Sequence, residues 1–331
     1  MGIVIKKNEA SALKENITED KKLTYEILKS LNISEEKEDV KIEEKTLEDE
    51  VKYKNKKKLF LKKEIVYLFL IIFLIFGAYS GINLIRWSFD AKNTENQINN
   101  INKVTQVEEV IDTIETTIVN PPQVESKENP YWDYIKMNLI NVDFKNLKNI
   151  NNDTVGWIKV NGTNINYPFV QTNDNNYYLK RDFYKKYNSA GWVFMDYRNS
   201  INNLNKNTIL YAHGRVDGTM FGSLKNITES NWYNDKNNHV VKISTEYENS
   251  LWQVFSIYKI PETSDYLEID FNSDNEFENF LEMLINRSEY DFNVDLNKGD
   301  KILTLSTCYK ENDRVVLHAK LIKMEVKNGN N

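Results

Sequence analysis

An uncharged apolar run, IVYLFLIIFLIFGAYSGINLI, occupies residues 65–85 and restricts how this chain can fold. At about 1.5 Å per residue, a helix of this length crosses a hydrocarbon core of roughly 30 Å. Backbone groups in lipid must bond to one another, so we expect a single transmembrane helix over residues 64–87. A cleavable signal peptide would begin nearer the first residue and have a shorter run, which leaves a buried core helix as the alternative.

The charges that flank this run predict its orientation. Arg86 and Lys92 stand almost alone on the C-terminal side, whereas lysines crowd the N-terminal side: Lys52, Lys54, Lys56, Lys57, Lys58, Lys62 and Lys63. Loops rich in Lys and Arg stay in the cytoplasm. The sequence therefore predicts a single-pass protein of the cell membrane, with a cytoplasmic N-terminus and the rest of the chain outside the cell.

Composition divides the remaining chain into three parts. Residues 1–63 are rich in Lys and Glu and are expected to form a largely disordered tail, with one short helix over 18–31. Residues 88–128 are rich in Asn, Thr and Glu and are expected to form a linker, either a helical stalk or an extended tether. Residues 129–327 contain recurrent short runs of apolar residues, as expected of a folded domain.

Short apolar runs predict a mostly β fold for this domain. After one or two helices over 130–151, we expect strands separated by Asn, Gly and Asp turns, at 155–160, 165–171, 191–197, 207–213, 239–245, 251–260, 301–308 and 314–326. A helix over 274–290 interrupts them, because Ser273 and Glu276 have the spacing of a capping box. Eight strands of this length predict a mixed or antiparallel β-barrel.

The chain carries one cysteine, three histidines and a formal charge of −6. A mildly acidic chain has no basic field for nucleic acid, so we expect no nucleic-acid partner. One cysteine cannot form an internal disulfide or a cysteine-rich metal site, and no metal site is expected. Outside the cell, the lone Cys308 would be a buried filler, an intermolecular bridge or a reactive thiol.

Strand alternation favours the reactive thiol. In LTLSTC the leucines share one face of the strand, while Cys308 emerges at the strand end on the less apolar face with Ser306. Arg314 opens the next strand after a short connection, so a hairpin would bring it close to the cysteine. A cation there favours the thiolate and can donate to a substrate oxygen. The alternative is a surface arginine paired with Asp313 or Glu311.

His213 is the histidine that we expect to act with this thiol. It ends a strand in NTILYAHG and precedes Gly214, a position from which a side chain can face a cleft. There it can serve as the acid or base of acyl transfer; the alternative is an exposed loop histidine. His318 shares a strand face with Arg314 but lies about 13 Å along that strand. His239, among Asn and Lys, is expected at the surface.

Together these motifs resemble the class B sortases of Gram-positive bacteria. The resemblance rests on TLSTC followed by an arginine and VVLHAKL, on AHGRVDGTMFGSL upstream, and on DTVGWIKVNGTNINYPFVQTNDNNYYL and AGWVFMDYRN. It runs from Asn129 to Val326. The fold that it implies is a sortase-type eight-stranded β-barrel, with N-terminal helices and an inserted helix before the strand that carries the cysteine.

By position, the resemblance implies that Cys308 is the nucleophile, His213 the catalytic histidine and Arg314 the residue that orients the substrate. The groove for the sorting signal would be lined by Asn175, Leu179 and Ser306. Such an enzyme is a cysteine transpeptidase without a cofactor, which joins surface proteins through a C-terminal sorting-signal peptide to a peptidoglycan amine. Membrane lipid would be a further partner, through the one helix. A hydrolytic extracellular cysteine protease and a non-catalytic, wall-associated β-domain remain the alternatives.

Overall fold

The computed structural model describes residues 37–122, 129–309 and 313–327, so the helix expected over 18–31 lies outside the described residues. The chain divides into two compact units, Met1–Gly81 and Ile82–Asn331.

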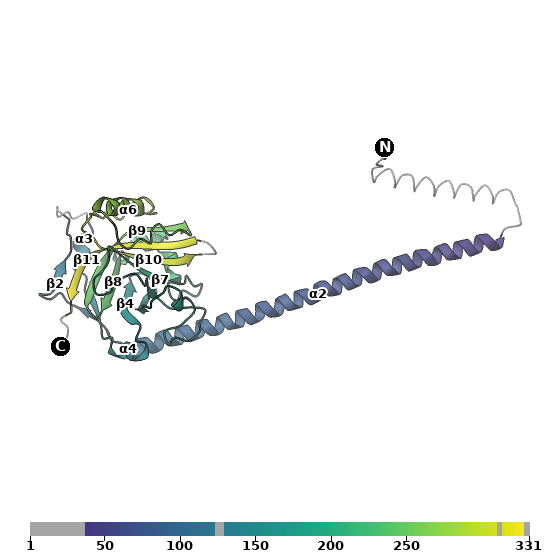
Figure 1. Cartoon of the computed structure of the whole chain (residues 1–331), viewed down its shortest axis with the longest axis horizontal. Helices are drawn as coiled ribbons and strands as arrows, with labels where there is room; N and C mark the ends of the chain where they lie inside the picture. The colour runs from purple at the N-terminus through teal and green to yellow at the C-terminus, as the bar shows by residue number, and fades with distance from the viewer. Residues whose placement is uncertain (1–36, 123–128, 310–312, 328–331) are drawn as a thin grey trace, which may run out of the picture. The chain divides into compact units, whose positions relative to one another are not determined.

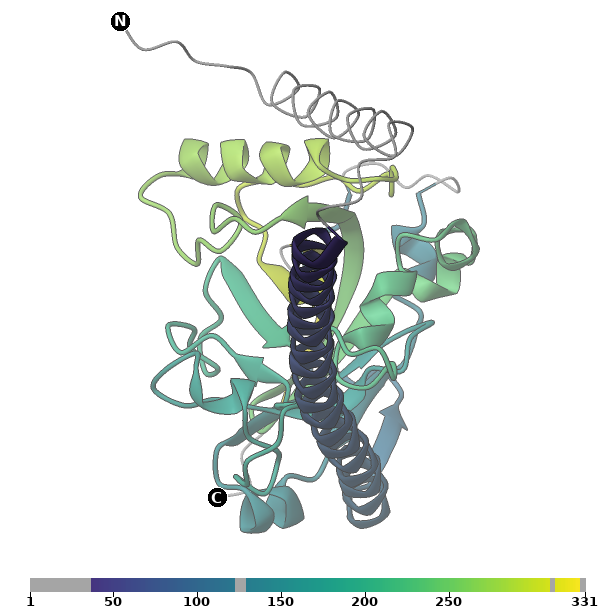
Figure 2. The ribbon, with the colours of Figure 1, turned by 90° about the vertical axis from the view of Figure 1, so that its right-hand side faces the viewer.

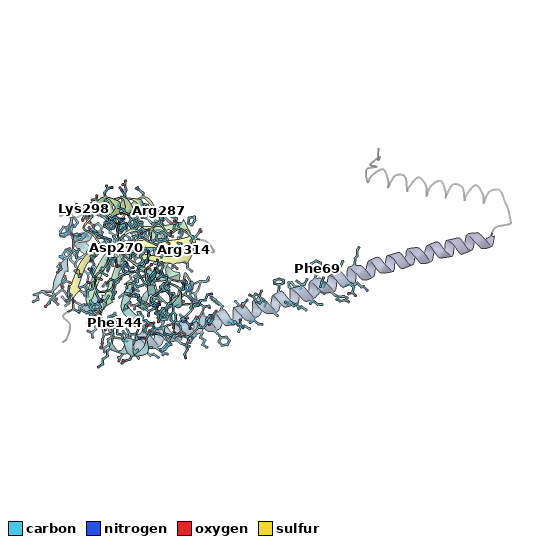
Figure 3. All side chains as sticks on the ribbon, in the orientation of Figure 1. Phe69, Phe144, Asp270, Arg287, Lys298 and Arg314 are labelled. Atoms are coloured by element: carbon cyan, nitrogen blue, oxygen red, sulfur yellow. The ribbon has the colours of Figure 1, made fainter. Side chains whose placement is uncertain are left out.

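Helix α2, Lys37–Val104, contains the apolar run. The side chains from Ile65 to Phe76 are all exposed, and Phe69, labelled in Figure 3, is 65 % exposed. By length and composition, this is the one helix among the described residues that could cross a bilayer. The structure is therefore compatible with the single membrane span that the sequence predicts.

The second unit is built around a closed barrel of eight strands (Figure 1). The strands are β4 Thr154–Val160, β5 Asn166–Val170, β6 Phe194–Met195, β7 Asn207–Ala212, β8 Val240–Thr245, β9 Glu248–Pro261, β10 Ile302–Tyr309 and β11 Asp313–Val326. Their order is β10-β7-β6-β5-β4-β8-β9-β11, and pairing of β10 with β11 closes the ring. The pairs β10–β7 and β5–β6 are parallel, and the others are antiparallel. The predicted mostly β, eight-stranded barrel is thus confirmed.

The core of the barrel holds three indole rings, Trp157, Trp192 and Trp252, each at most 1 % exposed. Each ring withdraws about 150–250 Å² from water, which is worth roughly 4–6 kcal/mol before the entropy cost of ordering is counted. This packing makes the barrel a rigid frame for the side chains at its rim. Short helical turns connect the strands: η1 Tyr177–Leu179, η2 Gly222–Asn226, α5 Ser230–Asn234 and η3 Lys236–Asn238.

Helix α6, Asp274–Asn286, lies between β9 and β10, where an inserted helix was predicted. It forms a separate layer on one side of the barrel in both ribbon views (Figure 2). The Ser273 side chain accepts from the Glu276 backbone N–H at 3.2 Å, as the capping-box spacing predicts. The helix ends four residues before the expected 290, because the chain turns back and the Glu289 N–H donates to the Ile257 carbonyl of β9.

Two expectations for the segment before the barrel were wrong in detail. Residues 130–151 are not simply helical: α3 Tyr131–Tyr134 and α4 Lys145–Ile150 flank a strand, β3 Leu139–Val142. Its partner is β1, Val107–Val110, which lies in the segment expected to be a linker. The strand forms because a partner about 30 residues away in the chain completes its backbone hydrogen bonds, which a local pattern cannot reveal.

The segment expected to be a linker, 88–128, contributes to the folded unit. Strand β2, Thr116–Ile118, pairs with β11. Between β1 and β2 in the chain, the Asp112 carboxylate accepts a hydrogen bond from the ammonium group of the buried Lys323 at 2.6 Å. In the last turns of α2, Thr94 and Ile101 are at most 1 % exposed. The folded unit therefore begins before the expected boundary at 129.

Candidate active site

The strand register brings the three predicted catalytic residues to one end of the barrel. Cys308 in β10 is paired with Arg314 in β11, across the hairpin that the sequence predicts. On the other side of β10, Thr307 is paired with Ala212 of the parallel strand β7. His213 follows Ala212, just as Cys308 follows Thr307. Backbone pairing alone thus places a cysteine, a histidine and an arginine on adjacent strand ends.

A groove of about 650 Å³ opens at this end of the barrel. All the other residues that the sequence singled out for the site line it: His213, Arg314, Asn175, Leu179 and Ser306. Further walls come from the segment between β9 and α6, and from β6, β7 and β10: Glu262, Thr263, Ser264, Tyr266, Leu267, Phe194, Tyr211, Ala212 and Thr307. The lining of the groove is thus partly polar and partly apolar.

His213 is half-buried, and its ring is held by a backbone carbonyl. Its Nε2 lies 2.7 Å from the carbonyl oxygen of Leu179. A carbonyl oxygen only accepts, so the proton of this bond belongs to Nε2. Leu179 was predicted as a lining residue of the groove; its carbonyl also fixes the orientation of the histidine ring, which no sequence motif indicated.

Arg314, labelled in Figure 3, is 17 % exposed and is held from two sides. Its Nη2 lies 2.7 Å from Glu262 Oε1, and its Nη1 donates to the Asp313 carbonyl at 3.2 Å. The Glu262 carboxylate is 65 % exposed, so water and salt weaken this pair. The pair with Glu262 therefore holds the guanidinium only weakly. The sequence had suggested Asp313 or Glu311 as the partner and gave no sign of Glu262.

Ser306 is one of the residues that line the groove. It is 4 % exposed, and its hydroxyl is 2.9 Å from that of Tyr266, which is itself buried. Tyr266 belongs to the segment between β9 and α6, far from Ser306 in the chain. Its place in the site depends on how that segment folds over β10, and the sequence offered no motif for it.

Asn175 is held in a polar network at the groove wall. Its amide donates to Asp196 Oδ2 at 3.0 Å, and its carbonyl oxygen accepts from the Tyr197 N–H at 3.0 Å. The Asp196 carboxylate also accepts from Arg198 and from the Tyr211 hydroxyl, both at 2.9 Å. Burial opposes ionisation of Asp196, but these donors outweigh it and lower its pKa. The network therefore presents a fixed wall to a ligand.

The other two histidines are buried away from the groove. His318 is fully buried, with Nε2 2.9 Å from the Tyr258 hydroxyl and Nδ1 2.9 Å from Thr304 Oγ1. The expectation that His239 lies at the surface was wrong. It is 5 % exposed, and its Nε2 donates to the Tyr233 carbonyl at 2.8 Å. Although its neighbours in the sequence are polar, the His239 ring stacks on the ring of Tyr233 in the folded chain.

We expect the free energy of unfolding to depend on pH through His318. Burial, with a smaller effect from the positive charge of Arg287, lowers the pKa of His318 to about 3. In the unfolded chain its pKa is about 6.5, so the unfolded state binds more protons between these two values. Hence the free energy of unfolding decreases as the pH falls from about 6.5 towards 3.

We expect His318→Gln to lose this pH dependence, because glutamine can bond to Tyr258 and Thr304 but takes up no proton. Urea unfolding of both proteins at about pH 5 and about pH 7 measures the difference. An equal loss of stability in both proteins between these pH values would show that His318 does not contribute.

Within the described ranges, no group of three or more His, Cys, Asp and Glu side chains could hold a metal ion. His213 and Arg314 bring an imidazole and a guanidinium to the groove, beside the strand end that carries Cys308.

Comparison with known proteins links this barrel to one family. Residues 158–322 match the model of the sortase domain. Sortase B of Staphylococcus aureus is 39 % identical over 185 residues, which cover 55 % of this chain and 75 % of that protein. Sortase B of Listeria monocytogenes is 36 % identical over 188 residues, which cover 54 % and 74 %.

A solved structure gives the same result. The structure of a Staphylococcus aureus sortase B–substrate complex matches with a TM-score of 0.52 and 38 % identity, over 54 % of this chain and 84 % of that one. Residues 158–322, which match the model of the sortase domain, include all the residues that line the groove. By identity over the barrel and by the fold of the barrel itself, the chain belongs to the sortase B family, whose members are cysteine transpeptidases.

Proposed function

We propose that this sortase is a membrane-anchored enzyme that cleaves a C-terminal sorting signal and attaches the surface protein to a peptidoglycan amine. Cys308 is the nucleophile, His213 the general acid and base, and Arg314 the residue that orients the substrate carbonyl. The observation that supports the proposal is the strand register: Cys308 is paired with Arg314, and Thr307 before it is paired with Ala212, the neighbour of His213.

In the first half of the reaction, the Cys308 thiolate attacks the backbone carbonyl after a Thr or Ser of the sorting signal, for example a signal of Asn-Pro-x-Thr type. A carbon–sulfur bond forms, and the carbonyl oxygen takes the negative charge. Backbone N–H groups near the cysteine and the Arg314 guanidinium stabilise that oxyanion. The carbon–nitrogen bond then breaks, and His213 gives its proton to the departing amine. The product is a thioester between the enzyme and the surface protein.

In the second half, a cell-wall amine attacks the thioester carbon. The neutral His213 accepts a proton from this amine, the carbon–sulfur bond breaks, and the thiolate is regenerated. The new amide joins the surface protein to peptidoglycan. No oxidant, reductant or cofactor enters the balance of either half.

The apolar part of α2 supports the anchoring. With the lysines of its N-terminal flank in the cytoplasm, the barrel lies on the outer side of the membrane, where peptidoglycan is assembled. The lipid bilayer is then a partner of the chain through this one helix.

The proposal is tested by incubating the full chain, in detergent micelles, with a panel of sorting peptides and either triglycine or diaminopimelate. We expect a thioacyl adduct by mass spectrometry and a ligated product that requires the amine. Peptide cleavage that yields only the free acid, with either amine present, would favour a hydrolytic protease. Neither cleavage nor adduct with any peptide would favour a non-catalytic domain.

A further inference from the structure

We propose that Gly191 is a positioning residue for His213. Because Gly191 has no side chain, the tight turn of residues 188–191 can lie close against the Leu179 carbonyl and the imidazole ring. This contact holds both groups in the orientation that catalysis needs. This inference rests on the proposed role of His213 as general acid. Gly191 touches no reacting atom, and it acts through its neighbours.

The space around Gly191 excludes any side chain. A Cβ at this position would lie 2.6 Å from the Tyr178 carbonyl oxygen, 2.9 Å from that of Leu179 and 3.1 Å from His213 Cδ2. The first two separations are shorter than real Cβ contacts, and both involve backbone. A side chain would thus displace the carbonyl that accepts from His213 Nε2, and would push on the ring itself.

The backbone conformation adds a second restriction. Gly191 has a φ of +61°, in the left-handed region that residues with a Cβ rarely adopt. The turn is also held in place on both sides. The Gly191 N–H donates to the Asn188 carbonyl at 3.1 Å, and the Trp192 N–H donates to the Tyr178 carbonyl at 2.9 Å. The turn therefore has little freedom to withdraw from the histidine.

Asn188 fixes the turn to the helix that enters the folded unit. Its side chain is fully buried, accepts from the Ala190 N–H at 2.9 Å and donates to Thr94 Oγ1 of α2 at 3.1 Å. Next to it, Asp90 of α2 accepts from the Ser189 N–H at 3.1 Å. Contacts with α2 thus hold the turn, and the turn holds the carbonyl that orients His213.

The consequence is kinetic. His213 must aim its proton at the departing amine, and a displacement of about 1 Å in such a group can cost 10²-fold in rate. The atoms nearest such a Cβ belong to Tyr178, Leu179 and His213, so Asn175, Ser306 and Arg314 in the groove are not directly displaced. Loss of Gly191 should therefore lower kcat much more than it changes KM.

The test compares Gly191→Ala with a matched control, Gly162→Ala, in the full chain. Gly162 has a similar φ of +67°, but the three atoms nearest to a Cβ there all belong to the side chain of Asn238, and neither residue lines the groove. We measure kcat and KM for a sorting peptide, the melting temperature, and the ring signals of 15N-labelled histidine, assigned with His213→Ala.

We expect both variants to lose thermal stability, because both force an alanine into a left-handed conformation. Gly191→Ala should lower kcat by about 10- to 100-fold with KM changed less than about 3-fold, and should shift the His213 Nε2–H signal. Gly162→Ala should keep kcat within about 2-fold and leave that signal in place.

Gly191→Asn keeps the test decisive if the alanine variant does not fold, since asparagine tolerates positive φ but still carries the intruding Cβ. Unchanged kcat and an unchanged His213 signal in a folded Gly191 variant would overturn the proposal. An equal loss of kcat in Gly162→Ala would overturn it as well. If the wild-type chain joins no peptide to an amine, the proposed function fails, but the His213 signal still decides whether Gly191 positions the ring.

Discussion

Cys308→Ala is expected to abolish the thioacyl-enzyme and to lower transpeptidation by at least about 10³-fold, because a thioester needs a thiol. Cys308 is the one cysteine of the chain, so no second thiol can replace it. Intact-mass spectrometry after incubation with a sorting peptide measures the adduct, and circular dichroism checks that the variant is folded.

The assignment of the nucleophile has a clear contrary outcome. If the Cys308→Ala protein still gains the mass of the acyl fragment, and peptide mapping locates it on another residue, the nucleophile has been misidentified. If the wild-type protein cleaves the peptide but the variant does so at the same rate, the reaction does not pass through a thioester.

The second large effect is expected at His213. His213→Ala should lower kcat by about 10²- to 10⁴-fold, the usual contribution of a positioned acid–base group. His318→Gln is the matched control, because His318 is fully buried among Tyr258 and Thr304 and does not line the groove. We expect it to change kcat by less than about 10-fold and to act mainly on stability.

Steady-state kinetics of both variants with one peptide and one amine measures this contrast. A larger loss in His318→Gln than in His213→Ala would reassign the acid–base role to His318. Equal losses would indicate that general stability, rather than proton transfer, limits both proteins.

Most barrel strands could be predicted because alternation and turn residues are local properties of the sequence. The runs that became β4, β7, β8 and β10 show this clearly. The strand β3 could not, since its pairing with β1 depends on a segment about 30 residues earlier. The stretch 191–197 gave only a two-residue strand, because Gly191 closes a turn just before it.

The site also has a part that could be predicted from the sequence and a part that could not. Cys308 and Arg314 could be paired from sequence because a short connection predicts a hairpin, and the register agrees. The contact of β10 with β7 joins strands about 90 residues apart, so the approach of His213 to Cys308 rested on the family resemblance.

Three groups that shape the groove carry no local signal. Glu262 and Tyr266 reach Arg314 and Ser306 from the segment after β9, and Gly191 reaches His213 across a turn. Such contacts exist only once the barrel has closed. These contacts therefore cannot be predicted from a single sequence.

The convergence of Cys308 and His213 at adjacent strand ends is tested most directly by a second cysteine at the histidine position. Neighbouring strands lie about 4.8 Å apart, within the roughly 4.4–6.8 Å between Cα atoms that a disulfide spans. Under mild oxidation, His213→Cys should form an intramolecular disulfide, seen as the loss of both titratable thiols in the monomer. His318→Cys, about 13 Å along the hairpin from Cys308, should keep both thiols. Two free thiols in oxidised His213→Cys, together with a disulfide in His318→Cys, would contradict the arrangement on which the enzyme mechanism depends.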